Sequence, residues 1–137
     1  MIKGCKYGTH RVIEPQGVLP QPALKINNDM NIYSNEILID VMALNVDSAS
    51  FTQIEEEAGH DVEKIKAKIK EIVGERGKMQ NPVTGSGGML IGTIEKIGDD
   101  LVGKTDLKVG DKIATLVSLS LTPLRIDEIV DVKPDID

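Results

Sequence analysis

Apolar side chains recur three or four positions apart between residues 61 and 76, which is the clearest pattern along the chain. The residues concerned are Val62, Ile65, Ile69, Ile72 and Val73. This spacing places them on one face of a helix, with lysines and glutamates on the other. Asp61 precedes the pattern as an N-cap, and Gly74 and Gly77 are stop signals. We therefore predict one main amphipathic helix at about residues 61–74, packed on β structure.

Alternating or continuous apolar runs predict the strands. Three of them fall near residues 36–44, 89–98 and 111–118, each bounded by Gly, Asn or Asp turn signals. A shorter strand is predicted near residues 11–13, inside an arm rich in Gly and Pro. Residues 118–122 continue the alternation of the third strand.

Three remaining segments carry weaker patterns. Residues 51–59 predict a short helix with its three consecutive glutamates on the solvated side. Residues 124–132 fit either a further strand or a turn of helix, and residues 134–137 have a loop-like sequence. Taken together, the elements indicate a mainly β chain.

Composition narrows the class of protein. A length of 137 residues predicts one domain, and the net charge of −6 is spread without a block of like charges. With only three aromatic residues as well, neither nucleic acid nor an anionic membrane is an expected partner. Cys5 is the only cysteine, which excludes an internal disulfide and a four-cysteine zinc site. No apolar run approaches about 20 residues and no signal core begins the chain, so we expect a cytoplasmic protein.

The N-terminal arm contains two candidate functional residues, His10 and Arg11. His10 is open to two interpretations, a ligand or base on one side and a packed or surface residue on the other. Arg11 either binds a substrate carboxylate through its bidentate fork or forms a surface ion pair. His60, just before the main helix, is expected in solvent.

A glycine-rich run, T-G-S-G-G, occupies residues 84–88. It lacks the terminal G-K-[ST] of a phosphate loop and precedes a strand rather than a helix. It also lacks the strand-turn-helix setting of a dinucleotide fingerprint. Its simpler role is close backbone approach in a cleft, where Thr84 and Ser86 supply hydroxyls. A purely structural turn is the alternative.

The order of glycine turn, strand, long turn, V-G-D and strand resembles the GroES-like domain of medium-chain dehydrogenases and reductases. Aligned on Gly92 and on the V-G-D at 109–111, the similarity runs over residues 87–114. The resemblance implies a partly open, GroES-like β-barrel, in which the main helix is an insertion. Family members carry the cofactor on a Rossmann domain that follows. We therefore expect residues 1–137 to be a single substrate-side domain, without its C-terminal Rossmann domain and inactive alone.

Zinc-dependent members of this family hold their metal with a His of the same pattern and a Cys of the active-site loop. The corresponding positions here are Gly88 and, within the loop at residues 45–50, approximately Asp47. A catalytic zinc ordinarily keeps three protein ligands. The resemblance therefore implies the zinc-free branch and no bound metal.

A narrower resemblance rests on four longer segments, which are residues 7–15, 44–54, 81–93 and 118–129. They are similar to the L-erythro-3,5-diaminohexanoate dehydrogenase family of anaerobic lysine fermentation. The resemblance implies oxidative deamination of L-erythro-3,5-diaminohexanoate to 5-amino-3-oxohexanoate and ammonia, with NAD or NADP as cofactor. It also implies a small diamino acid substrate and a homo-oligomeric full-length enzyme.

Asp47 is the only acid in the loop that the family directs at the cleft. The reacting amine must lose a proton before hydride leaves, and the substrate carries a second ammonium. We predict that Asp47 either takes that proton or pairs with the second ammonium; an Asx-turn within its own loop is the alternative. The other predicted catalytic and substrate-binding residues, besides Arg11, are Ser48, Ser50, Thr84, Ser86 and Gly88.

A stand-alone GroES-like binding or chaperone-like module is the alternative function. Co-chaperonins need a mobile loop that bears an apolar anchor. The segment at residues 74–88 offers only Met79 and Val83 as apolar side chains. This composition favours the enzyme.

Overall fold

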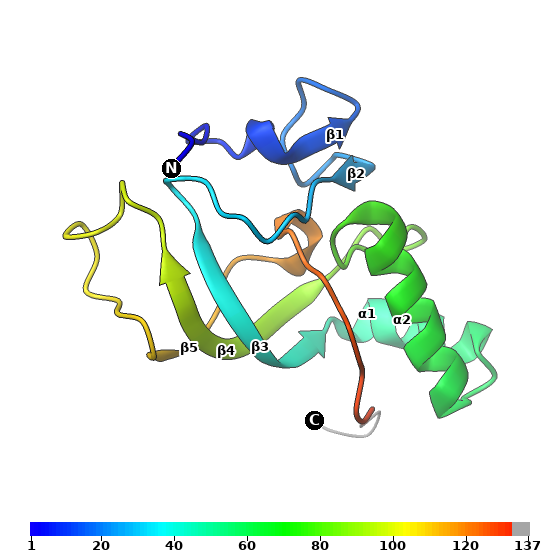
Figure 1. The fold of residues 1–137 in the computed structure, drawn as a ribbon. Coiled ribbons are helices and arrows are strands. Elements are labelled where there is room, and N and C mark those ends of the chain that lie inside the picture. Colours follow the sequence, from blue (N-terminus) through cyan, green and yellow to red (C-terminus); the bar gives the residue numbers. More distant parts are fainter. Residues whose placement is uncertain (133–137) are drawn as a thin grey trace.

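The computed structural model describes residues 1–132, which form two open antiparallel sheets and two α-helices (Figure 1). Neither sheet closes on itself within the described residues, which confirms the prediction of a mainly β, partly open fold. The small sheet has the order β1-β2 and the large one β3-β4-β5. The strands are β1 (Val12–Glu14), β2 (Lys25–Ile26), β3 (Ile37–Val46), β4 (Gly88–Ile97) and β5 (Lys112–Ala114).

The main helix, α2 (Val62–Arg76), follows the predicted pattern closely. Its N-cap is Asp61, whose side chain accepts hydrogen bonds from two backbone N–H groups of the first turn. Gly77 ends it in the left-handed conformation, with φ of 72°, and a Cβ there would overlap the Ile26 carbonyl. The stop predicted at Gly74 is wrong, because the helix runs through that residue.

The hydrophobic core lies between the helices and one face of the large sheet. Four predicted stripe residues of α2 are buried in it, but Val62 is 37% exposed at the first position of the helix. Figure 1 shows α1 (Ser48–Glu57) and α2 grouped on one side of the β3-β4 pair. The buried members of the core are Ile54, Ile65, Ile69, Ile72, Val73, Met79, Leu90, Leu119 and Leu124.

The structure confirms the predicted strands at β1, β3 and β4 and shortens the last one. β5 ends at Ala114, and the alternating residues 118–122 contain a 3-10 helix, Leu119–Leu121, instead of a strand. The Ser118 hydroxyl accepts the Ser120 N–H at 3.1 Å and so caps this turn. Serine side chains bond their own backbone in this way and compete with sheet pairing.

Residues 124–132 form neither of the two predicted elements. They run across the core without regular structure, anchored where the Leu124 N–H donates to the Gly77 carbonyl at 2.9 Å. The loop-like end predicted at 134–137 lies outside the described residues. Within residues 1–132, no helix combines the length and apolar character needed to cross a bilayer.

Candidate active site

Asp47 lies between β3 and α1, at the N-cap position of the helix. The predicted loop at residues 45–50 is wrong, because β3 continues to Val46 and α1 begins at Ser48. The Asp47 carboxylate makes no capping hydrogen bond, so the alternative of an Asx-type cap is also wrong. This side chain is exposed and has no hydrogen-bond or ion-pair partner within residues 1–132. The structure therefore presents an unpaired carboxylate at the end of a rigid strand.

The glycine-rich turn lies beside Asp47. The Asp47 N–H donates to the Gly87 carbonyl at 2.8 Å, which joins the start of α1 to the segment that leads into β4. The Thr84 and Ser86 hydroxyls hydrogen-bond each other at 2.8 Å on the exposed side of that turn. Together with the exposed Ser48, these residues form what we call the Asp47 cluster: Asp47, Ser48, Thr84 and Ser86.

Asn81, which was not among the predicted site residues, organises this region. Its buried side chain donates to the Ser50 carbonyl at 3.3 Å and to the Gln53 side chain at 2.8 Å, both on α1. Its Oδ1 accepts the N–H groups of Val83 and Thr84. One amide therefore fixes the turn against the helix. An Asn before a Pro is a turn signal, but only the fold reveals the partners on α1.

Two predicted site residues are turned away from solvent. Ser50 is fully buried, and its hydroxyl has no hydrogen-bond partner within the described residues, so it does not face a substrate. Gly88 is buried in β4 opposite Val46, and a Cβ there would overlap the Asn45 carbonyl. The absence of a side chain at Gly88 allows β3 and β4 to approach each other closely. The same crowding leaves no room for a side-chain ligand at this position.

Arg11 forms an ion pair, and this pair is buried and not at the surface. Its guanidinium is 4% exposed and donates to Glu36 through Nε at 2.8 Å and NH2 at 2.7 Å. The remaining N–H groups donate to the carbonyls of Asn27, Asp29 and Asn31. All five donors of the guanidinium are therefore used within the protein. Arg11 joins the N-terminal arm to β3.

The Glu36 carboxylate is the centre of this buried network. It also accepts the Tyr33 N–H at 2.7 Å and faces His10 Nε2 at 3.0 Å. Burial by itself would raise the pKa of Glu36, but the hydrogen bonds from Arg11, Tyr33 and His10 outweigh it and lower the pKa to about 2. Because His10 Nδ1 accepts the Cys5 N–H, its other nitrogen carries the proton given to Glu36.

The two histidines thus differ in environment. His10 is packed against the Tyr33 ring, with centroids 4.4 Å apart, which agrees with the interpretation of a packed residue. His60 is 69% exposed beside Glu55, as predicted.

Lys78 is a second buried cation that sequence reasoning missed. It is fully buried, and its ammonium donates to the carbonyls of Pro20 at 2.6 Å and Gln21 at 3.1 Å. Burial lowers the pKa of Lys78 to about 8, with a further contribution from the charge of Arg76. The side chain ties the N-terminal arm to the segment after α2. It reaches no solvent, so it is not a substrate ligand.

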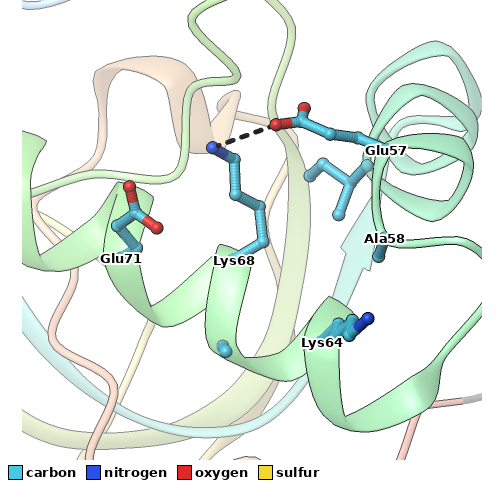
Figure 2. Close-up of a pocket in the computed structure, with 7 residues that line it drawn as sticks. Glu57, Ala58, Lys64, Lys68 and Glu71 are labelled. Carbon is cyan, nitrogen blue, oxygen red and sulfur yellow. Dashed lines mark ion pairs between the residues drawn. The ribbon is translucent and has the colours of Figure 1, made fainter.

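One hollow of the described surface lies away from the Asp47 cluster. It measures about 220 Å³, lies between α1 and α2, and has Ile54 and Ala58 among its lining residues. Figure 2 shows the ion pair of Glu57 and Lys68 at this hollow, with 3.5 Å between the charged atoms. In the Asp47 cluster, Asp47, Ser48 and Thr84 are exposed and Ser86 is half-buried. Across residues 1–132, no three His, Cys, Asp or Glu side chains converge as a metal site would require.

The glycine-rich turn does not fit the phosphates of a dinucleotide. Its N–H groups point inward: those of Val83 and Thr84 bond Asn81 Oδ1, and that of Gly85 bonds the Asn81 carbonyl at 2.7 Å. The Ser86 N–H bonds the Thr84 hydroxyl at 3.3 Å. No free row of donors is left to cradle a phosphate.

Comparisons with known proteins agree with one another. Residues 10–137 match the family model described as the L-erythro-3,5-diaminohexanoate dehydrogenase N-terminal domain. The L-erythro-3,5-diaminohexanoate dehydrogenase of Fusobacterium nucleatum subsp. nucleatum is 89% identical over 137 residues, which are 100% of this chain and 40% of that protein. The protein of the same name from Acetoanaerobium sticklandii is 88% identical over 136 residues, 99% of this chain and 40% of its own length. The chain therefore spans less than half the length of these relatives.

Proposed function

Since the chain belongs to the family of L-erythro-3,5-diaminohexanoate dehydrogenase N-terminal domains, we propose that it forms the substrate-side part of an enzyme that oxidatively deaminates L-erythro-3,5-diaminohexanoate. The observation that carries the proposal is the family match over residues 10–137, supported by the 88–89% identity to two relatives that bear this enzyme's name. The products are 5-amino-3-oxohexanoate and ammonia.

Asp47 has the chemistry that this reaction needs. Its carboxylate is exposed and unpaired within the described residues, so it is available to an ammonium of the substrate. An ammonium must lose a proton before its carbon gives up hydride, and a positioned carboxylate accepts that proton or holds the second ammonium. Thr84 and Ser86 add hydroxyls in the turn whose Gly87 carbonyl accepts the Asp47 N–H, and Ser48 adds a third.

The cofactor, NAD or NADP, is proposed to bind outside this chain. The inward-facing N–H groups of the glycine-rich turn speak against a phosphate site here. The steps assigned to this chain are therefore substrate binding and proton transfer.

The proposal extends to chemistry without zinc. The crowding at Gly88 by the Asn45 carbonyl supports this, because zinc-dependent enzymes of the resembling family carry His at the corresponding position. Elemental analysis of the full-length enzyme tests this point. One zinc per chain, lost in Asp47→Ala, would overturn it.

The alternative of a chaperone-like module has less support. Of the two apolar side chains in the segment at 74–88, Met79 is fully buried in the core and only Val83 is exposed. Asn81 also ties this segment to α1. The segment at 74–88 therefore does not have the features of a mobile loop with an apolar anchor.

A direct assay tests the proposed reaction. The full-length enzyme is mixed with L-erythro-3,5-diaminohexanoate and either NAD⁺ or NADP⁺, and reduced nucleotide and ammonia are measured together. We expect equal amounts of both products with one of the nucleotides, and none with L-lysine in place of the substrate. Absence of nucleotide reduction with both cofactors would reject the proposed function.

A further inference from the structure

The His10 imidazole lies in a polar corner between residues 1–8, which we call the N-terminal segment, and the start of β3. The side chain is only 13% exposed. Its ring packs against that of Tyr33, and a Cβ added to Gly4 would come within 2.8 Å of the imidazole Cε1. The N-terminal segment is therefore packed directly against this ring.

Both nitrogens of the imidazole are in use, and their roles are opposite. The backbone N–H of Cys5 donates to Nδ1 at 2.9 Å, so Nδ1 has no proton. Nε2 lies 3.0 Å from the Glu36 carboxylate, which only accepts, so Nε2 carries the proton. A neutral imidazole has one donor and one acceptor, and this corner uses each of them once.

A second proton on the ring is compatible with only one of these two contacts. An imidazolium carries N–H groups on both nitrogens, so Nδ1–H would face the Cys5 N–H, donor against donor. The contact of Nε2 with Glu36 is kept in either state, because Nε2 donates in both. Protonation therefore breaks the hydrogen bond to the N-terminal segment and leaves the imidazole attached to β3.

The charges around the imidazole limit what an added proton gains. Glu36 attracts an imidazolium, but its two oxygens already accept Nε and NH2 of Arg11 at 2.8 and 2.7 Å. The positive charge of Arg11 opposes a second cation beside the same carboxylate. The other titratable residues at this corner are Tyr33, through its ring, Cys5, through its backbone, and Asp29, whose carbonyl accepts Arg11 NH1 at 2.8 Å.

Two further hydrogen bonds hold the N-terminal segment. The Ser34 N–H donates to the Ile2 carbonyl at 2.8 Å, and the Asn35 side chain donates to the Cys5 carbonyl at 3.0 Å. Backbone carbonyls and amides do not change charge in the range of about pH 5 to 8, whereas histidine side chains do. The bond from Cys5 to His10 is therefore the pH-dependent one of these three.

We propose that His10 is a pH-sensitive latch for the N-terminal segment. In its neutral form it holds the segment through the Cys5 N–H. In its protonated form it releases that N–H and remains bound to Glu36. The inference goes beyond the proposed function and is independent of it, because it involves neither substrate nor cofactor.

Solvent exchange of the Cys5 amide tests the latch in the full-length enzyme. Cysteine is labelled with 15N, and the Cys5 signal is identified by its loss in Cys5→Ser. Exchange is measured between about pH 8 and pH 5 and divided by that of His10→Asn at the same pH, so that the intrinsic pH dependence of exchange cancels. The Asn carbonyl oxygen replaces Nδ1 as an acceptor but does not titrate. We expect this ratio to rise about tenfold toward the acidic end.

A second variant and a direct measurement complete the test. His10→Gln keeps a donor toward Glu36 but places no acceptor near Nδ1, so Cys5 should exchange rapidly already at pH 8. In the wild type, 15N signals of labelled histidine should show Nδ1 of His10 gaining its proton at the same midpoint as the change in Cys5 exchange.

Three outcomes would overturn the latch. One is a ratio that stays constant over the whole pH range in two variants whose melting temperatures show that they are folded. Another is wild-type exchange in His10→Gln. Different midpoints for the histidine and Cys5 signals would also overturn it, and that comparison needs neither variant. None of these results bears on the proposed reaction.

Discussion

Arg11 and Glu36 form a bidentate ion pair, with Nε and NH2 of the arginine 2.8 and 2.7 Å from the two carboxylate oxygens. The pair joins the N-terminal arm to the start of the large sheet. Arg11 is 4% exposed and the Glu36 side chain 19%, so solvent screens this pair little. The pair is therefore structural, and its loss should be seen in stability.

Stability should fall in acid through Glu36. Its pKa is about 2 in the folded protein against an ordinary value of 4.5. The folded state therefore binds this proton less readily, so the stabilisation is complete above about pH 4.5 and is lost as the pH falls toward 2. We expect Glu36→Gln to lower the free energy of unfolding by roughly 2 to 3 kcal/mol at pH 7 and by much less near pH 2. Urea unfolding at several pH values measures this; a constant difference would contradict it.

The two helix N-caps should respond differently to the same change. Asp61 accepts the N–H groups of Glu63 at 2.9 Å and Lys64 at 3.2 Å, whereas Asp47 accepts none. We expect Asp61→Ala to cost about 1 kcal/mol of stability and Asp47→Ala no more than a few tenths, from the helix dipole alone. Melting temperatures of the two variants provide the comparison. An equal loss in both would mean that Asp47 caps α1 after all.

Activity should depend on Asp47 in the full-length enzyme. Replacing it by Asn removes the negative charge that an ammonium of the substrate would meet, and a charge-assisted contact contributes about 1.5–3 kcal/mol. We expect kcat/KM to fall roughly 10- to 100-fold with an unchanged melting temperature. Asp106→Asn is the matched control, since Asp106 is another exposed acid without a hydrogen-bond partner in the described chain. A well-folded Asp47→Asn enzyme within about threefold of wild type would remove Asp47 from the mechanism.

Asn81 should matter for stability and for the order of the glycine-rich turn. Asn81→Ala leaves the Val83 N–H without its acceptor and frees the glycine-rich turn from α1. We expect a loss of about 2 to 3 kcal/mol, because a buried amide with several partners is removed. Gln53→Ala deletes only one of these partners and should cost about 1 kcal/mol or less. Chemical unfolding of both variants, with hydrogen exchange at residues 82–87, gives the readout; unchanged exchange in Asn81→Ala would contradict the assigned role.

Lys78 should give a pH dependence of the same sign in alkali, because its pKa is also lowered by folding. Its pKa is about 8 in the folded protein against 10.5 ordinarily, so the unfolded state holds more protons between these values. Stability contributed through this group therefore rises with pH between about 8 and 10.5. Relative to Lys78→Met, which keeps the length of the side chain without its charge, the wild type should gain roughly 2 to 3 kcal/mol across that window. Parallel unfolding curves for the two proteins at all these pH values would argue against a buried, charged Lys78.

The sequence determined the elements whose signals are local. The 3.6-residue apolar period, an acidic N-cap and a glycine stop together fixed α2, because each acts within a few residues of itself. The apolar runs of β3 and β4 likewise predicted these two strands. The four motifs that suggested the family are also continuous stretches of sequence, and the family comparison agrees with them.

Only the tertiary structure decided what the polar residues do. Arg11 and Glu36 are hydrogen-bonded although they lie 25 positions apart in the sequence, and Asn81 and Ser50 are hydrogen-bonded at a separation of 31. Contacts at such separations produce no periodic sequence pattern from which they could be predicted. Whether a polar side chain is buried with partners or exposed to a ligand depends on which distant segment packs over it. The fold therefore buries Arg11 and Ser50 and leaves Asp47 exposed, because desolvation and pairing are properties of the folded chain.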